Sequence, residues 1–352
     1  MLAYLSVLFL LWTLAFLYKE TRSFAPLFLI FLVLVLFGGL RNFSVGTDTF
    51  NYVHSFQSSS IMGESFFSFN KSFEPGYQML EKLVVLVSRE YWVLLSSIMV
   101  LSITPYLYSI TKLSHSFHIS IFLFFVLGAY LFVFNGGRQG LAAGLFSIGF
   151  VHLINRNFYK YLLWVGIAST FHLTALMMLP VYFLFGKKIT VFNVVLCTGL
   201  AVAAVFFSGN LMQNLEVIGF ERYAVYKNRG FSGGELTLLF YLVSFAILVF
   251  LKKQVNENMR GIYVLLLFMQ YLNLVIYIIV IAANLDVNLL RMSIYFSMAS
   301  ILIWPIALLS LQNTRSSIVI NLIFYAMHFV FFYFYLTRMS NLIPYVVNTE
   351  IL

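Results

Sequence analysis

The chain has 352 residues, of which 62% are hydrophobic, 19% aromatic and 9% charged. This composition contains far more apolar side chain than the core of a soluble domain can hold, so it excludes a soluble globular protein. The net charge of +9 comes from lysines and arginines scattered over the ends of apolar runs, which indicates membrane orientation and disfavours nucleic acid as a partner.

Apolar runs of about 17 to 23 residues recur along the chain, and an α-helix needs about 20 to cross a bilayer. The strict alternation that a membrane β-barrel requires is absent. We therefore predict an all-α, polytopic integral membrane protein with about 11–12 transmembrane helices, forming a single membrane domain over residues 1–352. The predicted segments are 2–18, 25–40, 91–111, 118–134, 139–154, 158–171, 173–186, 189–208, 236–252, 261–283, 289–311 and 316–337.

Two polar stretches, at about 41–90 and 209–235, are predicted to be extracytoplasmic loops. Residues 76–90 are short and amphipathic, so we expect a helix in the plane of the membrane interface; if this segment spans instead, the later topology inverts. With both termini outside, the positive-inside rule gives every short inner loop a basic residue. These basic residues are Lys19, Arg22, Lys112, Arg156, Lys160, Lys187, Lys188, Lys252, Lys253, Arg260 and Arg315.

Asp48 and Glu74 lie in the first long loop and are candidate proton acceptors. Asp48 follows a glycine turn and has a hydroxyl residue on either side, so its alternative role is an Asx turn. Glu74 precedes Pro75-Gly76, and its alternative role is a helix cap. Tyr52 and Tyr77 either stack on sugar rings or anchor the chain at the interface.

Arg138 follows Asn135-Gly136-Gly137, where two glycines let the backbone break and a new helix begin with Gln139 in its first turn. An arginine beside a helix N-terminus is unfavourable unless an anion is present, so this pattern predicts a phosphate site. The alternative is an arginine that extends to lipid headgroups. Arg291 repeats the pattern less clearly, with a salt bridge to Asp286 as its alternative.

His172 lies at the midpoint of the apolar stretch 158–186, which is too long for one helix and barely enough for two. We expect a broken pair of short helices here, because irregular backbone at membrane depth persists only where it lines a cavity. His172 then points into that cavity, or else only hydrogen-bonds a neighbouring helix.

Several motifs are absent. The sequence has no nucleotide-binding loop, no nucleophile elbow and no metal-ligand spacing among its histidines. ATP-driven transport, serine hydrolysis and zinc proteolysis are therefore disfavoured.

Five motifs occur in series between residues 41 and 296. They are Arg41 with Val45-Gly46-Thr47-Asp48-Thr49-Phe50-Asn51-Tyr52, Phe73-Glu74-Pro75-Gly76-Tyr77, Arg138-Gln139-Gly140-Leu141-Ala142, Phe171-His172-Leu173-Thr174-Ala175-Leu176 and Arg291-Met292-Ser293-Ile294-Tyr295-Phe296. Together they resemble the EpsG-like family of bacterial polysaccharide polymerases, which includes many Wzy proteins. The resemblance implies a multi-pass enzyme of the bacterial inner membrane that joins oligosaccharide repeat units carried on undecaprenyl diphosphate at the outer face. Such an enzyme builds O-antigen, capsule or exopolysaccharide without a cofactor or a metal.

This chemistry assigns roles to the polar residues. Without a metal, arginines must neutralise the leaving diphosphate, and one side chain must accept the proton of the acceptor hydroxyl. The expected diphosphate ligands are Arg138, Arg291 and Arg41. The expected proton acceptors are Asp48 first, then Glu74 and His172. The expected glycan contacts are Tyr52, Tyr77 and Gln139. The partners are the lipid-linked donor and acceptor and the bilayer, and a chain-length regulator is left open.

Two other classes of protein stay open. A flippase or exporter of the lipid-linked glycan also needs a cationic cavity, but its basic residues should reach into the membrane from both sides. A membrane acyltransferase that modifies the glycan needs a histidine near the cytoplasmic entry of its donor, whereas His172 is predicted to lie outside.

Overall fold

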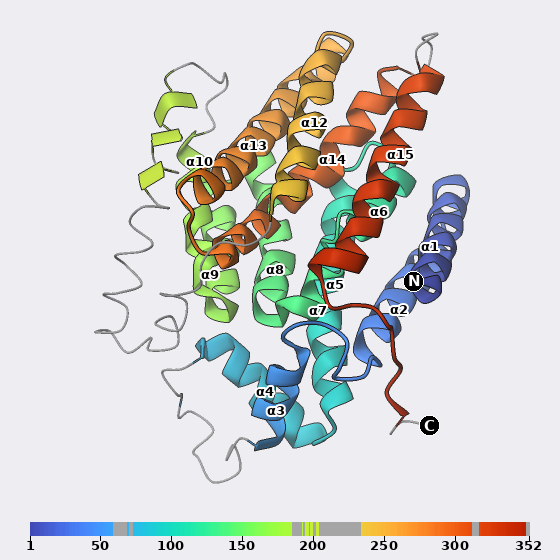
Figure 1. The fold of residues 1–352 in the computed structure, drawn as a ribbon, viewed down its shortest axis with the longest axis vertical. Helices are drawn as coiled ribbons and strands as arrows, with labels where there is room; N and C mark the ends of the chain where they lie inside the picture. Colours follow the sequence, from blue (N-terminus) through green and yellow to red (C-terminus); the bar gives the residue numbers. More distant parts are fainter. Residues whose placement is uncertain are drawn as a thin grey trace. The chain divides into compact units, whose positions relative to one another are not determined.

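The computed structural model describes residues 1–58, 69, 73–184, 234–311 and 317–349, with a few isolated positions between 192 and 203 (Figure 1). In this part of the chain the regular elements are helices, and one isolated antiparallel bridge joins Arg41 to Val347. The all-α prediction is confirmed. Two compact units are present and are described separately below, while the single membrane domain stays a prediction. Unit 1 comprises Met1–Phe69, Phe73–Leu176 and Ile323–Leu352, and unit 2 comprises Asn70–Ser72 and Met177–Leu322.

Five helical segments in the described part are long and apolar enough to cross a membrane. They are α1 (Leu2–Thr21), α5 (Tyr91–Leu113), α13 (Glu257–Ala282), η3 with α14 (Val287–Leu309) and α15 with η4 (Ser317–Met339). Shorter apolar helices are α2 (Phe24–Gly39), α6 (Phe117–Val126), the segment Leu173–Phe183 and α12 (Glu235–Leu251). By length and hydropathy the chain is a multi-pass membrane protein. The predicted segment 189–208 and loop 209–235 lie almost entirely outside the described residues.

Small residues bring the helices of unit 1 close together. α5 packs against α2 and against α8 (Gly137–Ile154), which in turn packs against α9 (Phe158–Phe171). A Cβ atom at Gly144 would lie 2.6 Å from the carbonyl oxygen of Ser102, and a Cβ at Gly39 would collide with Ser96. The hydroxyls of Ser109 and Ser147 lie 3.1 Å apart between α5 and α8. Such contacts are typical of helices that associate in a membrane.

The two ends of unit 1 differ in character. At one end, Tyr18 in the last turn of α1 packs on Phe117 at the start of α6, with 4.5 Å between ring centroids. Lys19 and Lys112 belong to the last turns of α1 and α5, so this end carries two of the basic residues that were predicted to lie in inner loops. At the other end lie the short helices α3 (Thr49–Ser58) and α4 (Pro75–Val87), both of which contact α5. Which end faces the cytoplasm stays a prediction.

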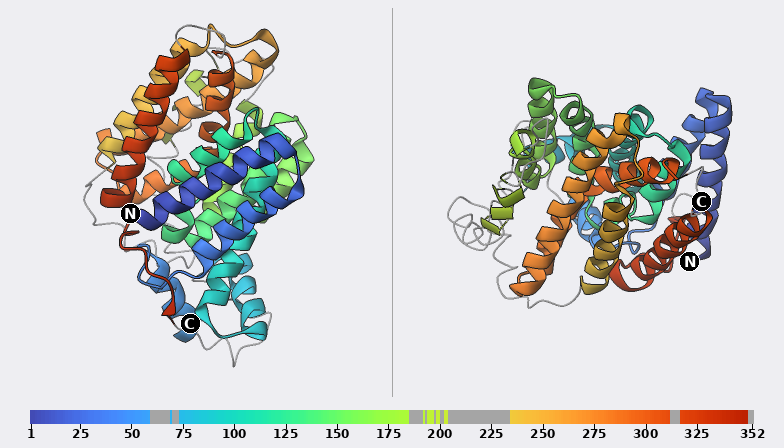
Figure 2. Two further views of the ribbon diagram at one scale, coloured as in Figure 1. Left: turned by 90° about the vertical axis from the view of Figure 1, so that its right-hand side faces the viewer. Right: turned by 90° about the horizontal axis from the view of Figure 1, so that it is seen from above.

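Unit 2 is built around α13, which packs against α12, η3 (Val287–Phe296) and α14 (Ser297–Leu309) (Figure 2). Its interior contains a polar pair, in which the Gln270 amide donates to the Ser300 hydroxyl at 2.7 Å. The Asp286 carboxylate accepts from the backbone N–H of Asn288 at 2.8 Å and caps the start of η3. This cap fixes the segment that carries Arg291.

Candidate active site

The two polar clusters of the first half of the chain are docked on each other. The backbone N–H of Thr47 donates to the side-chain oxygen of Asn135 at 2.9 Å, and the Thr49 hydroxyl donates to the carbonyl of Phe134 at 2.9 Å. Gly46 adopts a φ of 102°, and a Cβ at this residue would lie 2.5 Å from the Phe134 carbonyl oxygen. Only glycine accepts both the left-handed backbone and this close approach. The loop around Asp48 is therefore seated on the turn that precedes Arg138.

That turn begins a new helix, as predicted. The short helix α7 (Phe132–Asn135) ends at Gly136, whose extended φ of −148° interrupts the helical path, and α8 starts at Gly137. Arg138 thus lies in the first turn of an 18-residue helix. The ring of Tyr52, from α3, lies 3.2 Å from where a Cβ of Gly137 would be. The absence of that Cβ brings α3 close to Arg138.

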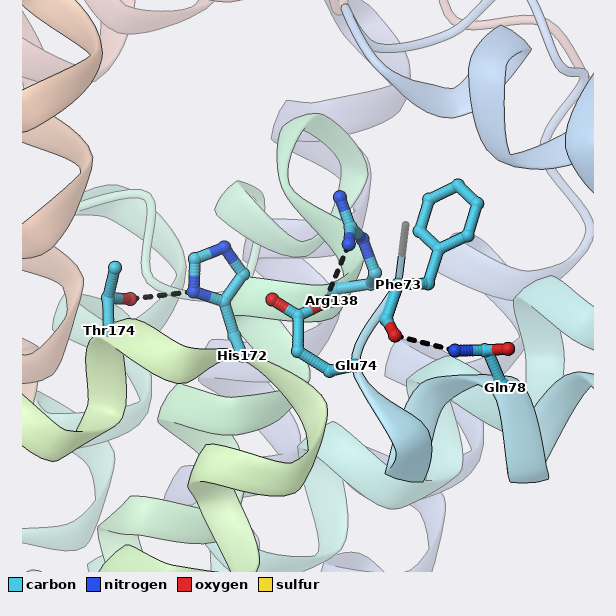
Figure 3. Close-up of polar contacts among 6 residues, drawn as sticks. All are labelled: Phe73, Glu74, Gln78, Arg138, His172 and Thr174. Atoms are coloured by element: carbon cyan, nitrogen blue, oxygen red, sulfur yellow. Dashed lines mark hydrogen bonds and ion pairs between the residues drawn. The ribbon is translucent and has the colours of Figure 1, made fainter. Parts of the chain in front are cut away.

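Arg138 forms a buried ion pair with Glu74. The guanidinium Nη1 donates to the Glu74 Oε2 at 2.7 Å, and the two side chains are 15% and 3% exposed (Figure 3). Glu74 occupies the N-cap position of α4, yet its side chain makes no capping hydrogen bond there. The carboxylate is instead directed at Arg138. In this structure the anion beside Arg138 is the Glu74 carboxylate, and the predicted phosphate at the start of α8 stays a prediction.

Three aromatic rings surround the Arg138 guanidinium. Its central carbon lies 4.8 Å from the Phe73 ring centroid, 5.7 Å from that of Tyr77 and 5.9 Å from that of Tyr52. Such rings attract the cation through their faces and restrict the positions open to it. The Arg138 Nε is buried and has no acceptor within the described part of the chain. This nitrogen is one hydrogen-bond donor that Glu74 leaves unused.

His172 lies at the break between α9 and the 3₁₀ segment η1 (Leu173–Met178), where its backbone is extended with φ −156° and ψ 119°. The break predicted within 158–186 is confirmed. The imidazole Nδ1 lies 2.7 Å from the Thr174 hydroxyl, which also accepts from the Gln139 amide at 3.4 Å. Figure 3 shows His172 and Glu74 projecting into the same space as Arg138.

The amphipathic segment predicted at 76–90 forms α4, and its buried face carries two charges that the sequence analysis did not single out. Glu81 is 5% exposed and Lys82 is 7% exposed. Burial raises the pKa of Glu81 to about 7, although the Tyr77 hydroxyl and Arg138 both act in the opposite direction. The Lys82 ammonium lies 5.0 Å from the Phe69 ring centroid. The helix is confirmed, and its lie in the membrane plane stays a prediction.

Arg41 is directed at the end of α2 and at Thr49, the residue that begins α3. It is 2% exposed, and its guanidinium lies 4.3 Å from the ring centroid of Phe134. One Nη group donates to the Gly38 carbonyl and the other to the Thr49 hydroxyl at 3.3 Å. Burial lowers the pKa of Arg41 to about 10, which leaves it charged at neutral pH. Its donors are thus directed at the protein, and its assignment as a diphosphate ligand stays a prediction.

The other predicted residues are distributed as follows. Asp48 is half-buried directly before α3, Tyr52 is half-buried on α3, and Tyr77 and Gln139 are buried. Arg291 is half-buried in η3 of unit 2 and is described with that unit alone. In the described residues, no group of three His, Cys, Asp or Glu side chains is arranged to hold a metal ion.

Sequence reasoning missed three residues of the site: Phe73, Thr174 and Asn135. Phe73 and Thr174 belong to the quoted motifs, so their positions next to Glu74 and His172 were the available signal. Asn135 was read only as part of a turn, and its side-chain contact with Thr47 joins segments 88 positions apart. No local pattern reports such a contact.

A comparison with protein-family models shows to which family the chain belongs. The model of the EpsG family matches residues 24–347 of the chain. The chain belongs to the EpsG family. It matches no curated protein and no solved structure. The EpsG family is linked to exopolysaccharide synthesis, and the matched region includes Glu74, Arg138 and His172.

Proposed function

We propose that this EpsG-family chain is a Wzy-type polysaccharide polymerase. It joins undecaprenyl-diphosphate-linked repeat units at the extracytoplasmic face of the bacterial inner membrane. The observation that carries the proposal is the Arg138–Glu74 ion pair at the start of α8, to which His172 is linked through Thr174 and Gln139, the residue after Arg138. A cation for a diphosphate and side chains able to take a proton are thereby held in one place, which is what a transfer without metal requires.

The reaction is a displacement at the anomeric carbon of the donor glycan. A hydroxyl of the acceptor repeat unit loses its proton to a side chain, and its oxygen forms the new glycosidic bond. The bond between the anomeric carbon and the diphosphate oxygen breaks, and undecaprenyl diphosphate leaves with the electron pair. The negative charge that develops on the leaving oxygen must be neutralised as the bond breaks.

Arg138 is suited to this task. A guanidinium stays charged and binds two phosphate oxygens at once, and the first turn of α8 adds backbone N–H groups with a favourable dipole. Glu74 already occupies one guanidinium nitrogen at 2.7 Å. A diphosphate at Arg138 therefore competes with the Glu74 carboxylate, and binding of the donor releases that carboxylate from its ion pair. A released carboxylate is a better proton acceptor than a paired one.

Three side chains remain candidates for the proton acceptor. Glu74 contacts the cation directly and is freed by the exchange just described. His172 is held by Thr174 through Nδ1. Asp48 lies at the start of α3, one turn before Tyr52, whose ring faces Arg138. A direct displacement with inversion needs only one of them.

The distribution of buried charge favours an enzyme over a flippase or exporter. In the described part of the chain, the charged side chains that are almost fully buried all belong to unit 1. They are Arg41, Glu74, Glu81 and Lys82. Arg41 follows the C-cap of α2, Glu74 is the N-cap of α4, and Glu81 and Lys82 lie on α4, at the end of unit 1 opposite Lys19 and Lys112. A transport path lined by charge from both sides is not what this arrangement resembles.

The test is reconstitution of the purified protein in vesicles with lipid-linked repeat units and no other protein. We expect the repeat units to lengthen into a ladder, and we expect Arg138→Lys to abolish most of it. Transbilayer movement of the lipid-linked glycan without lengthening would identify a flippase instead. Transfer of an acyl label to the glycan would identify an acyltransferase.

A further inference from the structure

The C-terminal residues 341–348, which we call the strap, run along the loop that supports the site. The bridge between Arg41 and Val347 is part of this contact. Backbone hydrogen bonds hold the strap at both ends and in between, so that it follows residues 40–46 closely. They join the Asn348 N–H to the Leu40 carbonyl at 2.9 Å, the Asn42 N–H to the Val346 carbonyl at 2.8 Å and the Gly46 N–H to the Asn341 carbonyl at 2.8 Å.

Two tyrosines fasten the strap to the first helices. The Tyr4 hydroxyl donates to the Leu342 carbonyl at 2.6 Å, and the Tyr345 hydroxyl donates to the Phe37 carbonyl at 2.7 Å. The rings of Phe37 and Tyr345 stack with their centroids 4.2 Å apart. Figure 1 shows the C-terminal segment passing beside α2 after the end of α15. The strap is therefore tied to α1 and α2 as well as to the loop.

The loop at residues 40–49 connects the strap to the turn that precedes Arg138. Its other side is seated on the turn before α8 through Thr47 and Thr49, as described above. Arg41 joins the two ends of the loop, since its two Nη groups donate to Gly38 and Thr49. Its guanidinium also lies over the Phe134 ring. A continuous series of contacts thus leads from the strap through the loop to the turn at Asn135, three residues before Arg138.

We propose that the strap and Arg41 are positioning elements that hold Arg138 in the orientation in which it binds a lipid diphosphate. Arg41 then acts through the loop and does not touch the phosphate. The identity of the ligand rests on the proposed function, whereas the mechanical connection rests on the contacts alone. Loosening the strap should consequently disturb the turn at residues 134–140 even in the absence of any ligand.

The experiment compares Tyr4→Phe/Tyr345→Phe with the wild type, because this pair removes two hydrogen bonds and keeps both rings. Tyr333→Phe is the matched control, since Tyr333 lies 53% exposed on α15. Hydrogen–deuterium exchange of residues 134–140 is measured on the full-length protein without ligand. We expect exchange there to be faster in the double variant and unchanged in the control.

The second readout is the Kd for undecaprenyl diphosphate, measured with and without Arg138→Gln. We expect the double variant to raise Kd about tenfold in the wild-type background, which two lost hydrogen bonds can supply. With Arg138→Gln the same change should raise Kd less than about twofold, because the strap acts through Arg138.

Unchanged exchange at residues 134–140 would overturn the proposal, and so would an equal rise of Kd in both backgrounds. Equal binding by wild-type protein and Arg138→Gln would contradict the proposed function instead. In that case the exchange measurement still decides whether the strap positions the turn.

Discussion

The Glu74 carboxylate lies 2.7 Å from the Arg138 guanidinium, although the two residues are 64 positions apart in the sequence. The pair joins the start of α4 to the start of α8 and is shielded by the rings of Phe73, Tyr77 and Tyr52. The buried Glu74 carboxylate is directed at Arg138 and makes no capping hydrogen bond to its own helix. In the mechanism proposed above, it holds the cation in position until the diphosphate takes its place.

Arg138→Lys should reduce polymer formation by about 100-fold or more, the usual effect of losing one preorganised donor of this kind. A lysine keeps the charge but cannot reproduce the bidentate fork or fill the space among three rings. The measurement is polymer length and rate in reconstituted vesicles. Arg260→Lys, at an exposed position of α13, is the control and should be normal. Near-normal polymer from Arg138→Lys would rule out the diphosphate clamp.

The proton acceptor can be ranked in a single assay of Asp48→Asn, Glu74→Gln and His172→Ala. Removing the true base should slow chain extension by about 100-fold while substrate binding persists, because general-base catalysis contributes about this much. The other two changes should be mild. Robust polymer from all three variants would mean that this polar cluster is structural, and the assignment of the base would be withdrawn.

Glu81 should make stability depend on pH. Its pKa is about 7 in the folded protein, compared with an ordinary value of 4.5, so the folded state binds the proton more tightly than the unfolded state. The contribution of Glu81 to the free energy of unfolding should therefore be greatest below about pH 4.5 and should decline as the pH rises to about 7. The loss is at most about 3 kcal/mol.

Glu81→Gln should remove this decline, since an amide does not ionise. The measurement is the thermal unfolding of detergent-solubilised protein between pH 5 and pH 8, with Glu90→Gln at an exposed position as the control. If the variant and the wild type lose stability in parallel over this range, Glu81 is not the group responsible.

The topology can be tested with single cysteines in a Cys197→Ser background. Asn51 is exposed on α3, so Asn51→Cys should be labelled from the extracytoplasmic side. Lys112→Cys should be labelled from the cytoplasm. A cysteine at position 233 tests the second predicted loop in the same way. Labelling of Asn51→Cys from the cytoplasm alone would reverse the orientation and remove the basis for extracytoplasmic polymerisation.

Much of the fold could be predicted from sequence because helix length and breaks are local properties. The breaks at Gly136 and His172 are visible in the glycine pair and in the awkward length of 158–186, and both are present. The all-α class follows from the apolar runs in the same way. The helical state of α4 was visible in its amphipathic pattern.

The partners within the site could not be predicted, because they depend on packing between distant segments. The sequence pointed to an anion beside Arg138, but not to Glu74 as that anion. It likewise grouped Arg41 with Arg138, whereas the structure places Arg41 against Gly38, Thr49 and Phe134. The contact between the C-terminal strap and residues 40–46 leaves no periodic signal in either segment.

The most direct test of the account is the affinity of Glu74→Gln for undecaprenyl diphosphate. If the diphosphate competes with Glu74 for Arg138, removing the carboxylate charge should tighten binding about tenfold, whichever side chain is the proton acceptor. Arg138→Lys should weaken binding, and Glu90→Gln should leave it unchanged. Binding by Glu74→Gln that is equal to or weaker than that of the wild type would contradict the claim that this ion pair marks the diphosphate site.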